Sequence, residues 1–121
     1  MFFGEKHLMQ PPSQAEVQLL HAQICQALAD PTRIKLLYLL ADSDQNVGEL
    51  GAALQVNQST VSRHLKVLRD RGMVHTERTG TTVTYSLADQ RVIEALGLLR
   101  AVMATDLLQK TALINLLDQN G

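Results

Sequence analysis

Apolar residues recur every three or four positions over most of the chain, a pattern typical of helices that bury one face. Side chains that can cap helix N-termini divide this pattern into segments. The capping residues are Ser13, Asp30, Asn46 and Asn57. The helices predicted from the pattern and these caps cover residues 14–28, 31–41, 47–54 and 58–71.

The apolar period changes from about 3.6 residues to about two after Gly72, which we expect to end the fourth helix. Residues 73–78 and 82–87 read as strands, and Gly80 lies in the turn between them. A last helix is predicted over residues 89–118. The fold class is therefore mainly α with a small β-hairpin, in the order four helices, two strands and a fifth helix.

The length of 121 residues is typical of one domain. We expect residues 1–12 to form a flexible N-terminal arm and residues 13–118 to form the domain. The last helix carries more apolar residues than one small core needs, so helices 14–28 and 89–118 are predicted to form a dimer interface. The alternative is that the last helix folds back on its own domain.

Composition argues against several classes of protein. Cys25 is the only cysteine, which excludes a disulfide framework and a thiolate-rich zinc site within one chain. We recognise neither a membrane-length apolar run nor a signal peptide, and we expect a soluble, cytoplasmic protein without a membrane partner. We find no glycine-rich phosphate loop, paired catalytic carboxylates or Cys/His/acid constellation, so we expect no enzyme and no evident cofactor.

The predicted helix 58–71 has two contrasting faces. Wound at about 100° per residue, it gathers Val61, Leu65 and Leu68 on one side. The opposite side carries hydroxyl and cationic groups, from Ser59, Ser62, Arg63 and Lys66. Such a face suits phosphate oxygens and base edges of DNA, although a polar helix face taken alone is also explained by solvation.

The distribution of charge favours the DNA-binding interpretation. The whole chain has a net charge of −1, but residues 58–80 hold five cations and two acids, a net +3, which leaves −4 for the remainder. A very short link joins helix 47–54 to helix 58–71, as in a helix-turn-helix. The hairpin that follows would be a wing, with Arg78 near its tip to contact phosphates or the minor groove.

Four segments carry a resemblance to a known family. They read LADPTRIKLL at residues 28–37, VGEL at 47–50, QSTVSRHLKVLRDRGMV at 58–74 and TYSL at 84–87. With them the chain resembles the ArsR/SmtB family of bacterial winged helix-turn-helix repressors over about residues 28–96. The resemblance implies a homodimer that binds an inverted-repeat operator in double-stranded DNA and represses transcription, until an inducer, often a metal ion, releases it.

The resemblance also implies which residues of the second helix of the motif contact DNA. They are Gln58, Ser59, Thr60, Ser62, Arg63 and Lys66, to which we add Arg78 of the wing. We choose Arg63 for base reading because its guanidinium group can donate two hydrogen bonds to the edge of a guanine. The alternative is that Arg63 contacts only a phosphate. His64 winds nearer to Val61 and Leu68 than to Ser59, so we interpret it as structural.

The two metal sites that the resemblance suggests lack most of their ligands here. Residues 46–48 are Asn-Val-Gly where metal sensors of the family often have Cys-x-Cys. In the site on the last helix Asp89 matches the first ligand, but Arg91, Val102 and Thr105 occupy the other places. We therefore interpret Asp89 as a helix cap and expect no metal at either site.

Two alternatives remain open for regulation and for function. His21 and Cys25 lie four residues apart on one helix face, and across a dimer they could form a metal- or redox-responsive site. The simpler interpretation is that Cys25 is a small buried residue. The effector, if there is one, is an unidentified small molecule or ion. The alternative function is that of a winged-helix module that binds proteins instead of DNA. Such a module would be expected to carry an apolar patch on helix 58–71 in place of the polar face.

Overall fold

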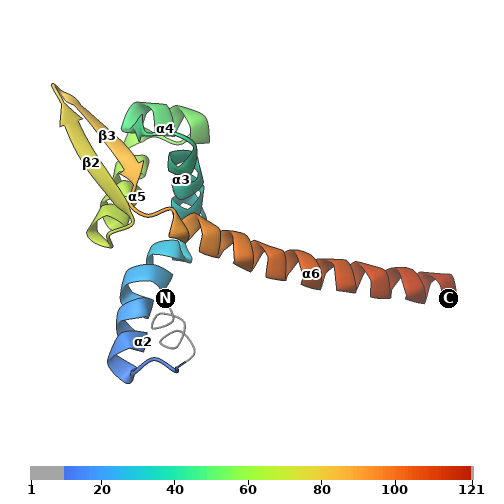
Figure 1. Cartoon of the computed structure of the whole chain (residues 1–121). Coiled ribbons are helices and arrows are strands. Elements are labelled where there is room, and N and C mark those ends of the chain that lie inside the picture. The colour runs from blue at the N-terminus through green and yellow to red at the C-terminus, as the bar shows by residue number, and fades with distance from the viewer. Residues whose placement is uncertain (1–9, 121) are drawn as a thin grey trace. The chain divides into compact units, whose positions relative to one another are not determined.

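The computed structural model describes residues 10–120 (Figure 1), so most of the expected N-terminal arm lies outside the described residues. The chain divides into a first unit that ends at Ala88 and a second that begins at Asp89. The elements of the first unit are α2 (Gln14–Leu20), η1 (His21–Cys25), η2 (Ala27–Ala29), α3 (Pro31–Asp42), β1 (Gln45–Asn46), α4 (Val47–Leu54), α5 (Gln58–Asp70), β2 (Val74–Thr79) and β3 (Thr82–Leu87). The second unit contains one long helix, α6 (Arg91–Asn120).

The side chains predicted to cap helices are at the N-termini of the four α-helices of the first unit. The Oγ of Ser13 accepts a hydrogen bond from the first turn of α2, and Asp30 Oδ1 does the same for α3. Asn46 forms a reciprocal capping box with Glu49 at the start of α4. Asn57 Oδ1 accepts from the amide of Thr60 in α5, at 2.8 Å. Local hydrogen bonding therefore sets where each helix begins.

The first predicted helix is regular only as far as Leu20, so the prediction of one helix over residues 14–28 was wrong in its second half. Residues His21–Cys25 form a π-helical turn, in which the amide of Gln26 donates to the carbonyl of His21 at 3.0 Å. A 3-10 turn, Ala27–Ala29, then leads into Asp30. The side chains of Arg33 in α3 and of Arg71, the residue that follows α5, donate to carbonyl oxygens in this segment, and a periodic pattern does not reveal such contacts.

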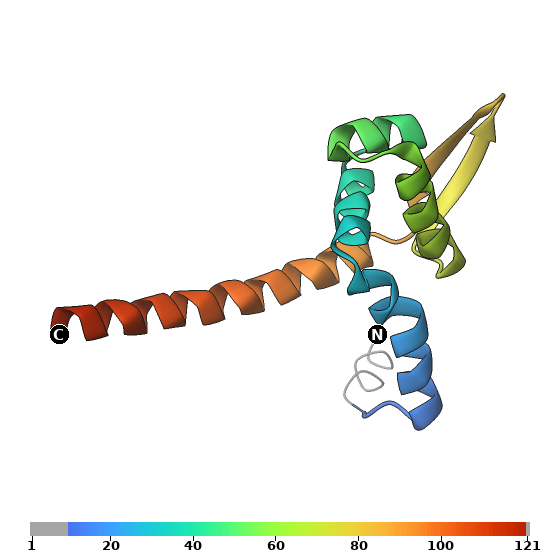
Figure 2. The same ribbon diagram turned by 180° about the vertical axis from the view of Figure 1, so that it is seen from behind.

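The core of the first unit lies between α3, α4 and α5, and Figures 1 and 2 show α4 lying across one end of the other two. One leucine or valine face of each helix points inward, as the sequence predicted for α5. The largest fully buried side chains are Leu36, Leu37, Leu50, Val61, Leu65, Leu68, Met73 and Val74. Burial of these side chains holds α5 against the other helices.

A close backbone approach shapes the turn between α4 and α5. Gln55 adopts a left-handed conformation with φ 58°, and the amide of Val56 donates to the carbonyl of Gly51 at 3.0 Å. A Cβ on Gly51 would lie 2.9 Å from the carbonyl oxygen of Val56, closer than such atoms are normally found. Gly51 therefore allows the short connection that makes α4 and α5 a helix-turn-helix.

The predicted hairpin is confirmed, and the structure adds a third strand. β2 and β3 pair antiparallel from Val74 opposite Leu87 to Thr79 opposite Thr82, with Gly80 at φ 64° in the turn. The two-residue β1 pairs with β3, which gives the strand order β1-β3-β2. No strand was predicted from the sequence at Gln45 and Asn46, because two residues are too few to display an alternating pattern.

The helix α6 exposes many large apolar side chains. Asp89 caps it, since its Oδ1 accepts from the amide of Arg91 at 2.9 Å, as predicted. More than half of the surface of each of several apolar residues is exposed in the single chain: Leu98, Leu99, Val102, Met103, Leu107, Leu108, Leu113, Ile114, Leu116 and Leu117. Among residues 10–120, no helix combines the length and hydrophobicity needed to cross a membrane.

The turn at Gly51 leads to a prediction about stability. Gly51→Ala should lower the free energy of unfolding by roughly 1–3 kcal/mol, because the added methyl group pushes the backbone of Val56 outward. Urea unfolding followed by circular dichroism measures the change. The matched control is Ala52→Ser, which adds one atom at the neighbouring exposed position and should change stability by less than about 0.5 kcal/mol. Equal effects of the two substitutions would contradict the close approach.

Candidate nucleic-acid interface

The helix α5 separates its apolar and polar residues as the sequence predicted. Val61, Leu65 and Leu68 are fully buried. The polar candidates on the other side are exposed, apart from the half-buried Thr60: they are Gln58, Ser59, Ser62, Arg63 and Lys66. One helix therefore presents six of the seven predicted site residues, all of them at least partly open to solvent.

The cap of α5 occupies part of this surface. Asn57 Oδ1 accepts from the hydroxyl of Ser59 at 2.9 Å as well as from the amide of Thr60. Ser59 must therefore turn its hydroxyl away from Asn57 before it can donate to a phosphate oxygen. The side chain of Gln58 lies against the first turns of α4, where a Cβ on Gly48 would be 3.6 Å from Gln58 Nε2.

The two cations of α5 that were predicted to contact DNA, Arg63 and Lys66, are held only by weak local contacts. Arg63 Nη2 donates to Thr60 Oγ1 at 3.5 Å, which is a long hydrogen bond. Lys66 Nζ lies 3.0 Å from Asp70 Oδ2 one turn later, and both side chains are mostly exposed. Exposed ion pairs of this kind contribute little to stability, so a phosphate can replace Asp70 at small cost. Both cations are thus available to a polyanion.

The seventh predicted residue, Arg78, lies on the wing. It is exposed on β2 opposite Val83, one residue before the end of the strand. Figure 1 shows the hairpin of β2 and β3 projecting from the helices of the first unit. The tip consists of exposed small polar residues, which are Thr79, Gly80, Thr81 and Thr82. Such a tip can approach a DNA backbone closely without bulky side chains in the way.

The inner side of α5 holds a polar contact that the sequence analysis missed. His64 lies near two residues at the start of α3: Arg33 Nη1 donates to His64 Nδ1 at 3.2 Å, and Asp30 Oδ1 is 4.0 Å from His64 Nε2. Desolvation raises the pKa of the Asp30 carboxyl, but hydrogen bonds from the amides of Thr32 and Arg33 and the positive charge of Arg33 lower that pKa below its ordinary value. The spacing of Asp30 and Arg33 around one helix start was the only available signal in the sequence.

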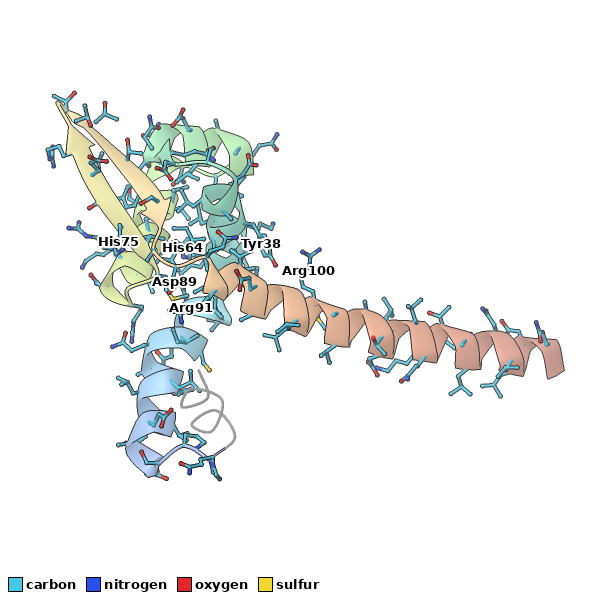
Figure 3. All side chains as sticks on the ribbon, in the orientation of Figure 1. Tyr38, His64, His75, Asp89, Arg91 and Arg100 are labelled. Atoms are coloured by element: carbon cyan, nitrogen blue, oxygen red, sulfur yellow. The ribbon has the colours of Figure 1, made fainter. Side chains whose placement is uncertain are left out.

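At the start of α6, Asp89 is bound by Arg91 (Figure 3). Arg91 Nε donates to Asp89 Oδ1 at 3.1 Å and Nη2 donates to Oδ2 at 2.7 Å. Hydrogen bonds from the side chain and the amide of Arg91 lower the pKa of Asp89 to about 2. Both carboxylate oxygens of Asp89 are therefore partners of a cation, and Oδ1 also accepts from the amide of Arg91, as a helix cap does.

Other groups that could bind a metal are few in the described part of the chain. His21 and Cys25 are both exposed on η1, so Cys25 is not the buried residue of the simpler interpretation. Across residues 10–120, no three His, Cys, Asp or Glu side chains gather where they could hold a metal ion.

Together these elements define a class of protein, the winged helix-turn-helix. Comparisons with known proteins identify the family. The profile described as "Bacterial regulatory protein, arsR family" matches residues 30–76. The HTH-type transcriptional regulator CmtR of Mycobacterium bovis is 43% identical over 86 residues, which cover 70% of this chain and 73% of CmtR. The chain belongs to the ArsR family of transcriptional regulators.

Two further similarities extend this assignment. The HTH-type transcriptional repressor SmtB of Mycobacterium tuberculosis is 39% identical over 90 residues, covering 74% of this chain and 67% of SmtB. The homodimeric winged helix-turn-helix DNA-binding domain of Mb0332 from Mycobacterium bovis, solved by NMR, matches with a TM-score of 0.68 and 31% identity, over 82% of this chain and 94% of that one. The chain is thus a DNA-binding transcriptional regulator, and its family is not one of enzymes.

The pairing of Asp89 with Arg91 leads to a prediction about pH. In Arg91→Gln the pKa of Asp89 should rise from about 2 toward its ordinary value of 3.8, because the cation that stabilises the carboxylate is gone. Carbon-13 NMR of the side-chain carboxyl measures the titration. Since the folded-state pKa is the lower one, ionised Asp89 stabilises the protein above pH 3.8, and this contribution disappears as the pH falls toward 2.

The control for this titration is Lys110→Gln, which removes one positive charge from α6 at the exposed pair with Asp106. It should leave the titration of Asp89 unchanged. An Asp89 midpoint that stays near 2 in Arg91→Gln would show that Arg91 is not the cause of the shift.

Proposed function

We propose that this regulator is a cytoplasmic repressor that binds an inverted-repeat operator in double-stranded DNA as a homodimer. The observation that carries the proposal is the two-faced helix α5, with its apolar side fully buried and its hydroxyl and cationic side exposed. The relative named as the repressor SmtB and the homodimeric Mb0332 domain support the repressor role and the dimer.

We assign the exposed groups to two kinds of contact. Arg63 reads a guanine edge in the major groove with its guanidinium fork, because it extends from the middle of the exposed face. Phosphate contacts come from the surrounding donors, which are Gln58, Ser59, Thr60, Ser62 and Lys66. Arg78 contacts the backbone or the minor groove beside the site. The polar character of this face favours DNA over a protein partner, which would more often meet an apolar patch.

We assign the dimer interface to α2 and α6. Three large apolar residues of α2 are about half exposed in the single chain, Val17 at 45%, Leu19 at 60% and Leu20 at 51%. With the apolar residues of α6 they form more exposed apolar surface than a monomer usually retains. A second copy of the chain is the partner that the homodimeric Mb0332 domain suggests.

The effector in this proposal is an unidentified small molecule or ion, and the two metal sites suggested by the family resemblance are absent. The residue set supports this, since Arg91 takes the position of one ligand and binds Asp89. The alternative is a metal- or redox-responsive repressor that uses His21 and Cys25, and it is favoured by one observation, the exposure of both side chains on η1.

The role of Arg63 is tested with DNA selected by the wild-type protein from a random-sequence library, and with a scrambled duplex of equal length. Arg63→Ala should weaken binding to the selected duplex by roughly 1–3 kcal/mol and reduce the preference over the scrambled one. Equal weakening on both duplexes, with a salt slope smaller by about one, would identify a phosphate contact instead. Fluorescence anisotropy at two salt concentrations measures both quantities.

The control is Lys110→Ala, which removes a cation from α6 and should leave the preference unchanged. Binding of the wild-type protein should weaken steeply with salt, because several phosphates are neutralised. A library that yields no enriched sequence, or affinity that does not respond to salt, would contradict DNA reading and favour the protein-interaction module.

The dimer interface is tested by placing a charge in it. Leu107→Glu should convert the dimer to monomers in sedimentation experiments, because an unpaired carboxylate is costly in an apolar interface. The matched control is Ala53→Glu, which adds the same charge to an exposed position of α4 and should leave the dimer intact. A dimer that persists in Leu107→Glu would place the interface elsewhere.

A further inference from the structure

The polar contact beneath α5 joins this helix to the start of α3. His64 is on α5, whereas Arg33 is in the first turn of α3 and Asp30 is its N-cap. Arg33 Nη1 lies 3.2 Å from His64 Nδ1, and Asp30 Oδ1 lies 4.0 Å from His64 Nε2. The side chain of His64 is only 13% exposed, so this contact lies under the helix and not on its DNA-facing side.

Arg33 is itself fixed by two further hydrogen bonds. Its Nε donates to the carbonyl of Ala27 at 2.8 Å, and its Nη2 donates to the carbonyl of Gln26 at 2.9 Å. A guanidinium is planar, so two bonds to neighbouring carbonyls also fix the direction of the third N–H group. His64 therefore meets a donor whose position is set by the backbone before α3.

The chemistry of the pair determines the state of the ring. An arginine can only donate, so His64 Nδ1 must be the acceptor and carry no proton. A neutral imidazole then has its proton on Nε2, the nitrogen on the side of Asp30. The histidine thus lies between a cation and an anion of the same helix start, and the hydrogen bond at Nδ1 defines its orientation.

A second hydrogen bond connects the C-terminal end of α5 to η1. Arg71, the C-cap of α5, follows His64 by seven residues, and its Nη1 donates to the carbonyl of Ala22. We call this bond and the bond between Arg33 and His64 the two ties of α5. The buried contacts of Leu65 and Leu68 are apolar and non-directional, and they alone would allow α5 to roll slightly about its axis. Hydrogen bonds have a preferred direction, so the ties at His64 and Arg71 restrict that rotation.

We propose that His64 is a positioning residue for DNA reading: by accepting from Arg33 it fixes the rotation of α5, and so the direction in which the adjacent Arg63 leaves the opposite face. This inference rests on the proposed function of α5. A base contact needs atoms within normal hydrogen-bond distance, whereas attraction to phosphates tolerates small shifts. Loss of the tie should therefore reduce sequence preference much more than overall affinity for DNA.

The test compares His64→Asn with His64→Leu. The two replacements have nearly the same shape, but only asparagine offers an oxygen at the place of Nδ1 to accept from Arg33. The probes are the duplex selected by the wild-type protein and its scrambled counterpart. The preference of His64→Asn should stay near that of the wild type, and His64→Leu should lose roughly tenfold or more of it, the equivalent of one base contact. Affinity for the scrambled duplex should change by less than about threefold.

If circular dichroism shows that both variants are folded, equal preference in His64→Asn and His64→Leu would overturn the positioning role. The packing of the side chain would then be enough to explain the effect of His64. If His64→Leu does not fold, Arg33→Met provides the second test, because the methionine side chain has no N–H group to donate and the substitution leaves the ring of His64 in place. It should reduce the preference to a similar extent, and unchanged preference in Arg33→Met would overturn the proposal.

A double variant distinguishes coupling from independent effects. Arg33→Met with His64→Asn should be no more selective than Arg33→Met alone, because the asparagine oxygen then has no donor to meet. If the asparagine still restores full preference without Arg33, the hydrogen bond is not the cause. A wild-type protein that enriches no sequence from the library would instead defeat the proposed function, and this result is separate from any difference among the variants.

Discussion

Burial of one side of α5 is the constraint on which the rest of the first unit depends. Val61, Leu65 and Leu68 have no exposed surface, so the helix must sit against the core formed with α3 and α4. Because these three residues define the inner side, the hydroxyl and cationic residues at the intervening positions have to face outward. The surface proposed for DNA is thus a direct consequence of core packing, and the short turn at Gly51 sets where that surface lies relative to α4.

Packing decides which side of α5 faces inward, while directional bonds define its rotation more finely. Both ties to α5, through Arg33 and through Arg71, end on backbone carbonyls between Ala22 and Ala27. The π-helical and 3-10 turns of this segment present those carbonyls to the arginine side chains, and the carbonyl of Gln26 also accepts from the amide of Ala29. The segment between α2 and α3 therefore acts as the fixed reference for the helix proposed to read DNA.

These features explain why the sequence predicted some elements well and missed others. Capping residues, the apolar period and the turn glycines act between neighbours in the chain, so α4, α5 and the hairpin could be predicted nearly to the residue. The π-helical turn, β1 and the His64 contact depend on groups far apart in sequence, such as Arg71 and Ala22, which are 49 positions apart. For the same reason the exposed face of α5 was predictable, but the contact beneath it was not.

The contacts of Asp89 at the start of α6 support the proposal that the family's metal site on this helix is absent here. A carboxylate binds a metal through free oxygen lone pairs, but both oxygens of Asp89 accept from Arg91, and the pKa near 2 shows that the negative charge is already stabilised. A metal ion there would have to displace a cation that is tethered two residues away, and it would meet Arg91 in place of a second ligand. The proposed effector is therefore better sought at other groups, and the exposed His21 and Cys25 on η1 lie in the segment to which Arg71 ties α5.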